Sequence, residues 1–409
     1  MTLDGQMEEL GAAARAGADA LRTASADQRT AAILGMARAL RSQAAEVLAA
    51  NAEDLGRTDR HRDRLMLDEA RIEAIAASLD AVAALPDPVG AEMARWRRPN
   101  GLDIARVRTP IGVIGMIYEA RPNVTADAAA ICVRSGNAVI LRPGSDCFAS
   151  SVGIHCALAM GLEEAGLPAA AVQIVPTPDR AAVGALLSGL DGSIDLLIPR
   201  GGRSLVERVQ AEARVPVLGH LEGICHTYVH QAADPDMATA IVRNAKLRRV
   251  SICGATETLL IDRAALPLLP AIARALRGCE LRGDAEAASV VRMKLADVSD
   301  WRTEYLAPIL SICTVSDWKE AASHIVRYGT GHTEAIVTED AEVAEAFLAR
   351  VDSAIVLWNA STQFADGGEF GFGAEIGIAT GKLHARGPVG PEQLTSFRYL
   401  VRGTGQVRA

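Results

Sequence analysis

Ile111-Gly-Val-Ile-Gly-Met-Ile117 is a continuous apolar stretch, and it opens the part of the sequence in which strand and helix patterns alternate. Each further strand pattern is separated from the next by a helix pattern. Such alternation predicts a parallel α/β sheet with right-handed crossovers. The expected strands are 111–117, 137–141, 172–175 and 194–198, and the expected helices between them are 127–133, 148–165 and 179–188.

The carboxyl ends of these strands are where a parallel sheet usually binds its ligands. They fall at residues 118–123, 142–145, 176–179 and 200–204. The last of these follows a strand and opens a helix, so its backbone N–H groups can hold a phosphate. It lacks the G-x-G-x-x-G spacing of a standard dinucleotide fingerprint, and a plain glycine turn is the alternative.

The sequence on either side of this sheet has a different character. Residues 7–90 are alanine-rich with charges at helical intervals, and Pro86 and Pro88 end that helical segment. Residues 101–109 alternate apolar and polar, which predicts an edge strand or a hairpin. After Cys253 we expect a second α/β unit, then a glycine-rich loop at 364–390 and a short strand at 399–401. The second unit has expected strands at 256–261, 287–292, 309–315, 334–338 and 353–357, and expected helices at 264–277, 317–327 and 340–349.

Composition limits the class of protein. A chain of 409 residues is long enough for two domains, and 49% hydrophobic content with 4% aromatic content indicates a core of Ala, Val, Leu and Ile. The net charge of −8 argues against nucleic-acid and acidic-membrane binding. Seven scattered cysteines without C-x-x-C spacing suit a reduced, cytoplasmic compartment. Neither a signal peptide nor a membrane span is expected.

The stretch Leu247-Arg-Arg-Val-Ser-Ile-Cys253-Gly-Ala-Thr256 sets a cysteine between a basic cluster and an apolar strand. Lys246, Arg248 and Arg249 precede the sulfur, and nearby cations favour the thiolate, which is the nucleophilic form. Gly254 lets backbone approach a ligand closely. A buried cysteine that packs as a small hydrophobe is the alternative.

Three further candidates are weak when each is taken singly. The Asn123 amide can donate to an oxyanion, although a turn residue is the alternative. Glu304 is most simply a surface carboxylate. His220 and His226 lie on either side of a glutamate and a cysteine, which is a weak pattern for metal ligands, so no metal is predicted.

The combination of these motifs resembles the aldehyde dehydrogenase superfamily, and within it the gamma-glutamyl phosphate reductase family. The resemblance runs from the first helices to Arg402. The motifs that carry it are Ile117-Tyr-Glu-Ala-Arg-Pro-Asn-Val-Thr125, Ile140-Leu-Arg-Pro-Gly-Ser145, Ile194-Asp-Leu-Leu-Ile-Pro-Arg-Gly-Gly202, Ser251-Ile-Cys-Gly-Ala-Thr-Glu-Thr258 and Phe364-Ala-Asp-Gly-Gly-Glu-Phe-Gly-Phe-Gly-Ala-Glu-Ile-Gly-Ile378.

The resemblance implies a role for each matching residue. Cys253 matches the family's nucleophile, Asn123 the oxyanion-hole asparagine, and Glu304 the glutamate that holds the nicotinamide ribose. Arg142 matches the residue beside the adenosine ribose. The expected cofactor contacts are Arg142, Pro143, Gly144, Ser145, Gly201, Gly202, Ser204 and Glu304, and the expected substrate contacts are Arg121, Arg249, Lys382 and Arg386.

Ser145 bears on the choice of cofactor. NAD-preferring relatives have a glutamate at this place, and its carboxylate would repel the 2′-phosphate of NADPH. Ser145 is neutral, and Arg142 adds a cation on the same turn, although Asp146 is adjacent. The resemblance therefore implies a preference for NADPH.

The resemblance also implies an activity and an architecture. The implied reaction is the NADPH-dependent reduction of L-glutamyl 5-phosphate to L-glutamate 5-semialdehyde and phosphate through a cysteine thioester, in proline biosynthesis. The implied architecture is two Rossmann-like parallel-sheet domains with a small β flap for homo-oligomerisation, and association with glutamate 5-kinase is left open. The NADPH-binding domain would span 1–95 and 108–222, the catalytic domain 223–386, and the flap 96–107 and 387–409.

His220 marks a departure from other aldehyde dehydrogenases. Their general-base glutamate, which activates hydrolytic water, falls on His220 in this sequence. Loss of that glutamate fits a reductase that releases phosphate. Two alternatives remain, a non-phosphorylating aldehyde dehydrogenase and a non-catalytic homologue.

Overall fold

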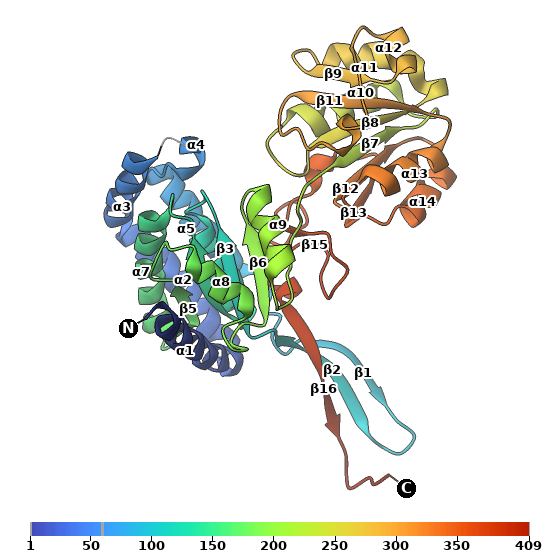
Figure 1. The fold of residues 1–409 in the computed structure, drawn as a ribbon. Coiled ribbons are helices and arrows are strands. Elements are labelled where there is room, and N and C mark those ends of the chain that lie inside the picture. Colours follow the sequence, from blue (N-terminus) through green and yellow to red (C-terminus); the bar gives the residue numbers. More distant parts are fainter. Residues whose placement is uncertain (1, 59–60, 409) are drawn as a thin grey trace. The chain divides into compact units, whose positions relative to one another are not determined.

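The computed structural model describes residues 2–58 and 61–408, which form two compact units (Figure 1). Unit 1 runs from the N-terminus to Gly219 and also includes Gly371–Gly377 and the segment from Val389 onward. Unit 2 comprises His220–Phe370 and Ile378–Pro388. Each unit has its own parallel sheet.

The sheet of unit 1 confirms the predicted alternation. It has the order β5-β4-β3-β6, and all its strand pairs are parallel. The chain runs outward from β3 to β5 and then returns to β6 on the other side of β3, so the strand order reverses between β3 and β6. The strands are β3 (Val113–Tyr118), β4 (Ala138–Pro143), β5 (Val172–Ile174) and β6 (Leu196–Arg200), with helices α6 (Val124–Arg134), α7 (Phe148–Glu164), α8 (Ala181–Ser188) and α9 (Arg203–Glu212).

The alanine-rich N-terminal segment forms helices, as predicted. Helix α1 packs with α8 in one core cluster of the unit 1 sheet, whereas α2 packs against α5 and α7. Gly35 in α2 and Gly161 in α7 allow the backbones of these helices to touch. A Cβ at Gly161 would lie 2.1 Å from the Met36 nitrogen. These helices are α1 (Leu3–Thr23), α2 (Ala26–Ser42), α3 (Ala44–Arg57), α4 (Arg62–Leu65) and α5 (Glu69–Ala84).

A three-stranded antiparallel sheet, which we call the flap, forms a separate part of unit 1. Its order is β1-β2-β16, with β1 (Glu92–Arg97), β2 (Asp103–Pro110) and β16 (Thr395–Arg402). The expected strand at 399–401 is longer than predicted, because β16 pairs with β2 along eight residues. This pairing lies within one chain and leaves the other edge of β16 unpaired within the sheet.

Unit 2 has a seven-stranded, all-parallel sheet with the order β10-β9-β11-β8-β7-β12-β13. Alternate side chains of its central strands face opposite layers: Leu259 packs with α10 and α11, and Leu260 packs with α13 and α14. The strands are β7 (Cys225–Val229), β8 (Thr256–Asp262), β9 (Glu280–Gly283), β10 (Lys294–Leu295), β11 (Ile309–Val315), β12 (Thr333–Val337) and β13 (Ile355–Trp358). The helices are α10 (Pro235–Leu247), α11 (Leu269–Ala275), α13 (Trp318–Tyr328) and α14 (Ala341–Arg350).

The prediction of a strand at 287–292 is wrong. This stretch belongs mainly to helix α12 (Ala285–Val290), which Asp284 caps by accepting a hydrogen bond from the Ala287 N–H at 2.8 Å. The expected helix at 264–277 begins instead as a 3₁₀ turn, Arg263–Leu268, with Pro267 inside it. Within the glycine-rich segment, β14 (Ile378–Ala379) pairs with β15 (Gly387–Pro388). Further 3₁₀ turns are Ala169–Ala171, Asp300–Arg302, Thr362–Phe364 and Glu392–Leu394.

Across residues 2–58 and 61–408, the structure contains no helix with the length and apolar character needed to cross a bilayer.

Candidate active site

Cys253 lies in the turn between α10 and β8, where it is half-buried. The segment just before β7 presses against this turn. A Cβ at Gly223 would lie 2.1 Å from the Cys253 carbonyl oxygen, so only glycine fits there. The Cys225 thiol donates to the same oxygen at 3.0 Å. The backbone of the cysteine turn is therefore held by two residues of a neighbouring segment.

Two imidazoles lie beside Cys253. One ligand-type atom from each of His220, Cys253 and His332 lies within 4.8 Å of the others, and the two histidine ring centroids are 4.8 Å apart at 78°. Each residue comes shortly before one of three neighbouring strands: His220 before β7, Cys253 before β8 and His332 before β12. Because the strands are parallel, their amino ends meet at one edge. In unit 2 the candidate chemistry thus lies at the amino ends of the strands, opposite to the usual position of ligands.

Hydrogen bonds orient both rings. His220 Nδ1 lies 2.6 Å from the Ile378 carbonyl oxygen, which can only accept, so Nδ1 carries the proton and the neutral ring has its lone pair on Nε2. His332 Nδ1 lies 2.9 Å from Thr333 Oγ1 and 3.5 Å from Cys225 Sγ. His332 is fully buried, and its Nε2 has no hydrogen-bond partner among the described residues. The sequence had not pointed to His332 as a candidate residue.

The basic cluster before Cys253 is arranged differently from expectation. Lys246 is fully buried, and its ammonium group is 2.5 Å from a Glu257 carboxylate oxygen. Burial raises the pKa of Glu257 to about 7, although the Lys246 charge opposes that rise. Arg248 contacts the Gln363 side chain at 3.4 Å, and Arg249 is exposed. Lys246 is therefore paired with Glu257. The basic groups that lie beside the Cys253 sulfur are the imidazoles of His220 and His332.

Glu304 is half-buried and is more than a surface carboxylate. It accepts a hydrogen bond from the Gly223 N–H at 3.0 Å, in the same segment that presses on the Cys253 turn. Burial raises the pKa of its carboxyl group.

The candidate residues of unit 1 gather at the carboxyl ends of β3, β4 and β6. Glu119 follows β3 and accepts a hydrogen bond from the Gly202 N–H at 3.3 Å, at the point where the strand order reverses. Asn123 precedes α6, and its amide donates to Asp127 at 2.9 Å. Arg142 is buried and donates to the Pro178 and Asp179 carbonyls at 2.9 and 3.2 Å.

Two of these positions have groups that suit the anionic parts of a nicotinamide cofactor. The start of α9 has no side-chain cap, and the Glu119 carboxylate at Gly202 shows that an anion suits it. Arg142 Nε is buried without a hydrogen-bond partner among the described residues, and Ser145 on the same turn is exposed. The start of α9 therefore offers backbone donors, and Arg142 lies at the end of β4 with Ser145 on the turn after it, as the sequence predicted.

Two of the four predicted substrate contacts share one carboxylate. Lys382 and Arg386 both form ion pairs with Asp352, the second at 2.6 Å, and they lower the pKa of Asp352 to about 2. Arg121 belongs to unit 1 and donates to the Glu119 carbonyl at 3.3 Å. Asp352 thus offsets part of the positive charge expected for the substrate.

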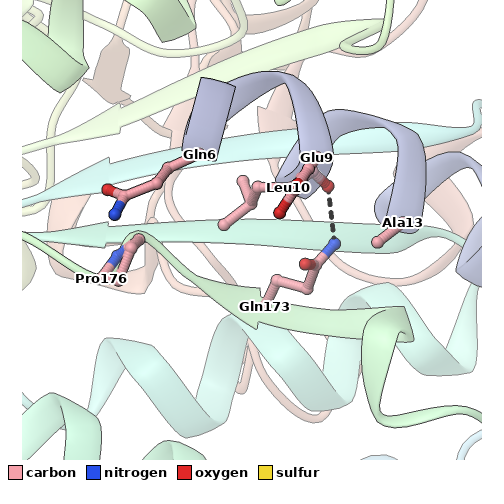
Figure 2. Close-up of a pocket in the computed structure, with 6 residues that line it drawn as sticks. All are labelled: Gln6, Glu9, Leu10, Ala13, Gln173 and Pro176. Atoms are coloured by element: carbon pink, nitrogen blue, oxygen red, sulfur yellow. Dashed lines mark hydrogen bonds between the residues drawn. The ribbon is translucent and has the colours of Figure 1, made fainter. Parts of the chain in front are cut away.

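A pocket in unit 1 lies between α1 and the end of β5 (Figure 2). The Gln173 amide at its floor donates to the Leu10 carbonyl at 2.9 Å. Its lining residues are Gln6, Glu9, Leu10, Ala13, Gln173 and Pro176. Pro176 begins one of the strand ends predicted to bind ligands, but none of the predicted catalytic, cofactor or substrate contacts lines the pocket.

Comparisons with known proteins agree over nearly the whole chain. The aldehyde dehydrogenase family matches residues 4–277 and 287–374. A gamma-glutamyl phosphate reductase of Caulobacter vibrioides is 67% identical, covering 98% of this chain and 100% of that protein. One from Parvibaculum lavamentivorans is 60% identical, covering 98% and 97%. The crystal structure of gamma-glutamyl phosphate reductase from Thermotoga maritima superimposes with a TM-score of 0.96 at 40% identity, covering 99% of this chain and 100% of that one.

Similarity of this extent, in sequence and in fold, places the chain in a family: it belongs to the aldehyde dehydrogenase family and, within it, to the gamma-glutamyl phosphate reductases.

Proposed function

We propose that this enzyme reduces L-glutamyl 5-phosphate to L-glutamate 5-semialdehyde and phosphate with NADPH, in the cytoplasmic synthesis of proline. The observation that carries the proposal is the group of Cys253, His220 and His332 at the amino ends of three neighbouring strands. It supplies a nucleophile and nearby bases. The position of the general-base glutamate used for hydrolysis is held by His220.

The first half of the reaction is the formation of a thioester on Cys253. An imidazole, His220 or His332, takes the thiol proton, and the thiolate attacks the carbonyl carbon of the acyl phosphate. The bond from that carbon to the phosphate oxygen then breaks, and phosphate leaves with the electron pair. The Asn123 amide and the Cys253 N–H are the proposed donors to the oxyanion formed during this exchange.

The second half is the release of the aldehyde. Arg142, Ser145, Gly201, Gly202, Ser204 and Glu304 are the residues that would hold NADPH, with Pro143 and Gly144 shaping the turn. Bound there, NADPH would provide the hydride that reduces the thioester on Cys253. Cys253 then leaves as a thiolate when the carbon–sulfur bond breaks, and the neighbouring imidazolium returns its proton to the sulfur.

The experiment that tests this function follows NADPH oxidation with glutamyl phosphate generated in the cuvette by a glutamate kinase and ATP. We expect oxidation of NADPH to require both the kinase and glutamate, and one semialdehyde to form per NADPH consumed. Omitting the kinase is the matched control. NADPH oxidation at the same rate without the kinase, or none with the complete mixture, would reject the proposal.

A further inference from the structure

We propose that Cys253, His220 and His332 form a binding site for a single Zn²⁺ ion, which reversibly switches off the nucleophile. One cysteine and two histidines are a donor set that Zn²⁺ prefers. No metal is needed for the proposed reduction, so this site would be regulatory.

The separations suit the ion after a small adjustment. One donor atom from each residue lies within 4.8 Å of the others. Zinc–sulfur bonds of about 2.3 Å and zinc–nitrogen bonds of about 2.0–2.1 Å require tetrahedral ligands to lie roughly 3.3–3.6 Å apart. The side chains must therefore approach by about 1 Å. Cys253 and His220 are both half-buried, so neither side chain is fully enclosed, and rotation of the side chains is the adjustment that we expect.

The surroundings of the two histidines are those of metal ligands. A ligating histidine typically donates its other ring N–H to a carbonyl or carboxylate, which fixes the tautomer. His220 donates from Nδ1 to the Ile378 carbonyl at 2.6 Å. His332 has Nδ1 beside Thr333 Oγ1, while its buried Nε2 has no hydrogen-bond partner among the described residues. With Nδ1 protonated, His332 Nε2 has a lone pair that no hydrogen bond satisfies, and a bound cation would accept that lone pair.

The other histidine near this segment has a different arrangement. His226 is buried in β7 and pairs with Glu334 of β12 at 2.9 Å. His226 is therefore not part of the candidate metal site, although the sequence pattern included it. His332, from a distant part of the chain, lies beside His220 and Cys253 instead.

Zinc binding would change the chemistry of Cys253 directly. A coordinating thiol is deprotonated outright, and its proton is released to solvent. The sulfur lone pair that attacks the acyl phosphate is then shared with the metal. Removal of zinc by a chelator restores the free thiol without any redox step.

The test measures binding rather than turnover, so its result is independent of the proposed reaction. Zn²⁺ is titrated into the purified enzyme against a fluorescent zinc chelator, for the wild type and for Cys253→Ser, His220→Gln and His332→Gln. We expect one Zn²⁺ per wild-type chain and at least about tenfold weaker binding in each variant. The matched controls are Cys156→Ser and His61→Gln, whose side chains are exposed and which should bind zinc like the wild type.

Two further readouts identify the sulfur. Co²⁺ bound in place of zinc should show thiolate-to-metal charge-transfer absorption that is lost in Cys253→Ser, and Zn²⁺ should slow alkylation of Cys253 by iodoacetamide. Circular dichroism checks folding, because His332 is fully buried. If His332→Gln does not fold, the zinc affinities of the His220→Gln and Cys253→Ser variants, whose side chains are only half-buried, test the proposal. Equal zinc affinity in these variants and the wild type, or alkylation of Cys253 that zinc leaves unchanged, would overturn the proposal.

Discussion

The surroundings of Cys253 come from residues that are remote from it in the sequence. His332 lies 79 residues after Cys253, and Gly223 and Cys225 hold the cysteine backbone from the preceding segment. The cations that precede Cys253 in the sequence suggested an electrostatic activation. The structure instead gives Lys246 to Glu257 and brings imidazoles to the sulfur.

We predict that Cys253→Ser abolishes turnover while NADPH still binds. A serine hydroxyl lacks the nucleophilicity of a thiolate near neutral pH. The measurement is NADPH oxidation together with a fluorescence titration of NADPH. Residual activity above about a tenth of the wild type would reject Cys253 as the nucleophile. Alanine at the other six cysteines should alter stability by about 1 kcal/mol, with the exposed Cys156 as the mildest control.

Ser145 provides a second test at a single side chain. We predict that Ser145→Glu lowers NADPH affinity by on the order of tenfold, since a lost charged contact is worth about 1.5–3 kcal/mol. Its exposed position at the start of the turn after β4 leaves room for the glutamate. NADH use should change much less, and Ser145→Ala serves as the neutral control. An unchanged ratio of kcat/KM for the two cofactors would show that this turn does not contact the 2′-phosphate.

The elements on either side of the cysteine turn are joined by a buried ion pair. Lys246 near the end of α10 and Glu257 in β8 are 0% and 1% exposed, and Glu257 also accepts from the Leu306 N–H at 3.3 Å. A buried pair of this kind is costly to break on one side, because a lone charge remains. It thereby fixes the distance that the turn must span.

We predict that Lys246→Met destabilises the protein by about 3–5 kcal/mol near neutral pH, and that adding Glu257→Met recovers much of the loss. Without Lys246, the pKa of Glu257 rises further above its unfolded value. The folded state then holds a proton that the unfolded chain releases, so stability falls as pH rises from about 4.5 through the raised pKa.

Urea unfolding at about pH 5.5 and about pH 8 measures this effect, and the deficit should be larger at the higher pH. Arg263→Met is the control, because its pair with Glu286 is exposed on both sides and worth less than about 1 kcal/mol. A deficit that is equal at both pH values would contradict the assignment of the lone charge to Glu257.

Sequence periodicity predicted most helices and strands because the buried β-branched runs are flanked by proline and glycine. It failed at 287–292, where a strand was predicted but Asp284 caps a helix. Periodicity did not predict the strand β7, so only the resemblance, which aligns His220 with a general-base glutamate, pointed to His220 as a neighbour of Cys253. His332 could have been found as a polar residue directly before a predicted strand, but the order of strands in a sheet depends on tertiary packing.

The flap is the feature of the molecule that bears on assembly. Strand β16 forms one edge of its sheet, and its side chains Phe397, Tyr399 and Val401 are 44%, 54% and 55% exposed. An exposed apolar edge strand is a surface on which another chain can pair. Homo-oligomerisation is still a prediction, and we expect the outer edge of β16 to form the contact between subunits.

We predict that truncation before Phe397 lowers the oligomeric state or the solubility. The deletion removes six of the eight residue pairs between β16 and β2 and the whole apolar edge. Truncation after Arg402 is the matched control, because it removes only the tail beyond the strand. Light scattering coupled to size exclusion measures the subunit number, and the same number in both truncated proteins would show that the edge has no part in assembly.

The phosphate requirement of the reverse reaction tests the central claim most directly. The enzyme is given glutamate 5-semialdehyde and NADP⁺ with and without inorganic phosphate, and NADPH formation is followed. If phosphate attacks the Cys253 thioester and releases the acyl group, NADPH accumulates only when phosphate is present. The product should then react with hydroxylamine, as an acyl phosphate does. NADPH formation at the same rate without phosphate, with free glutamate as the product, would contradict the account and identify a hydrolytic aldehyde dehydrogenase.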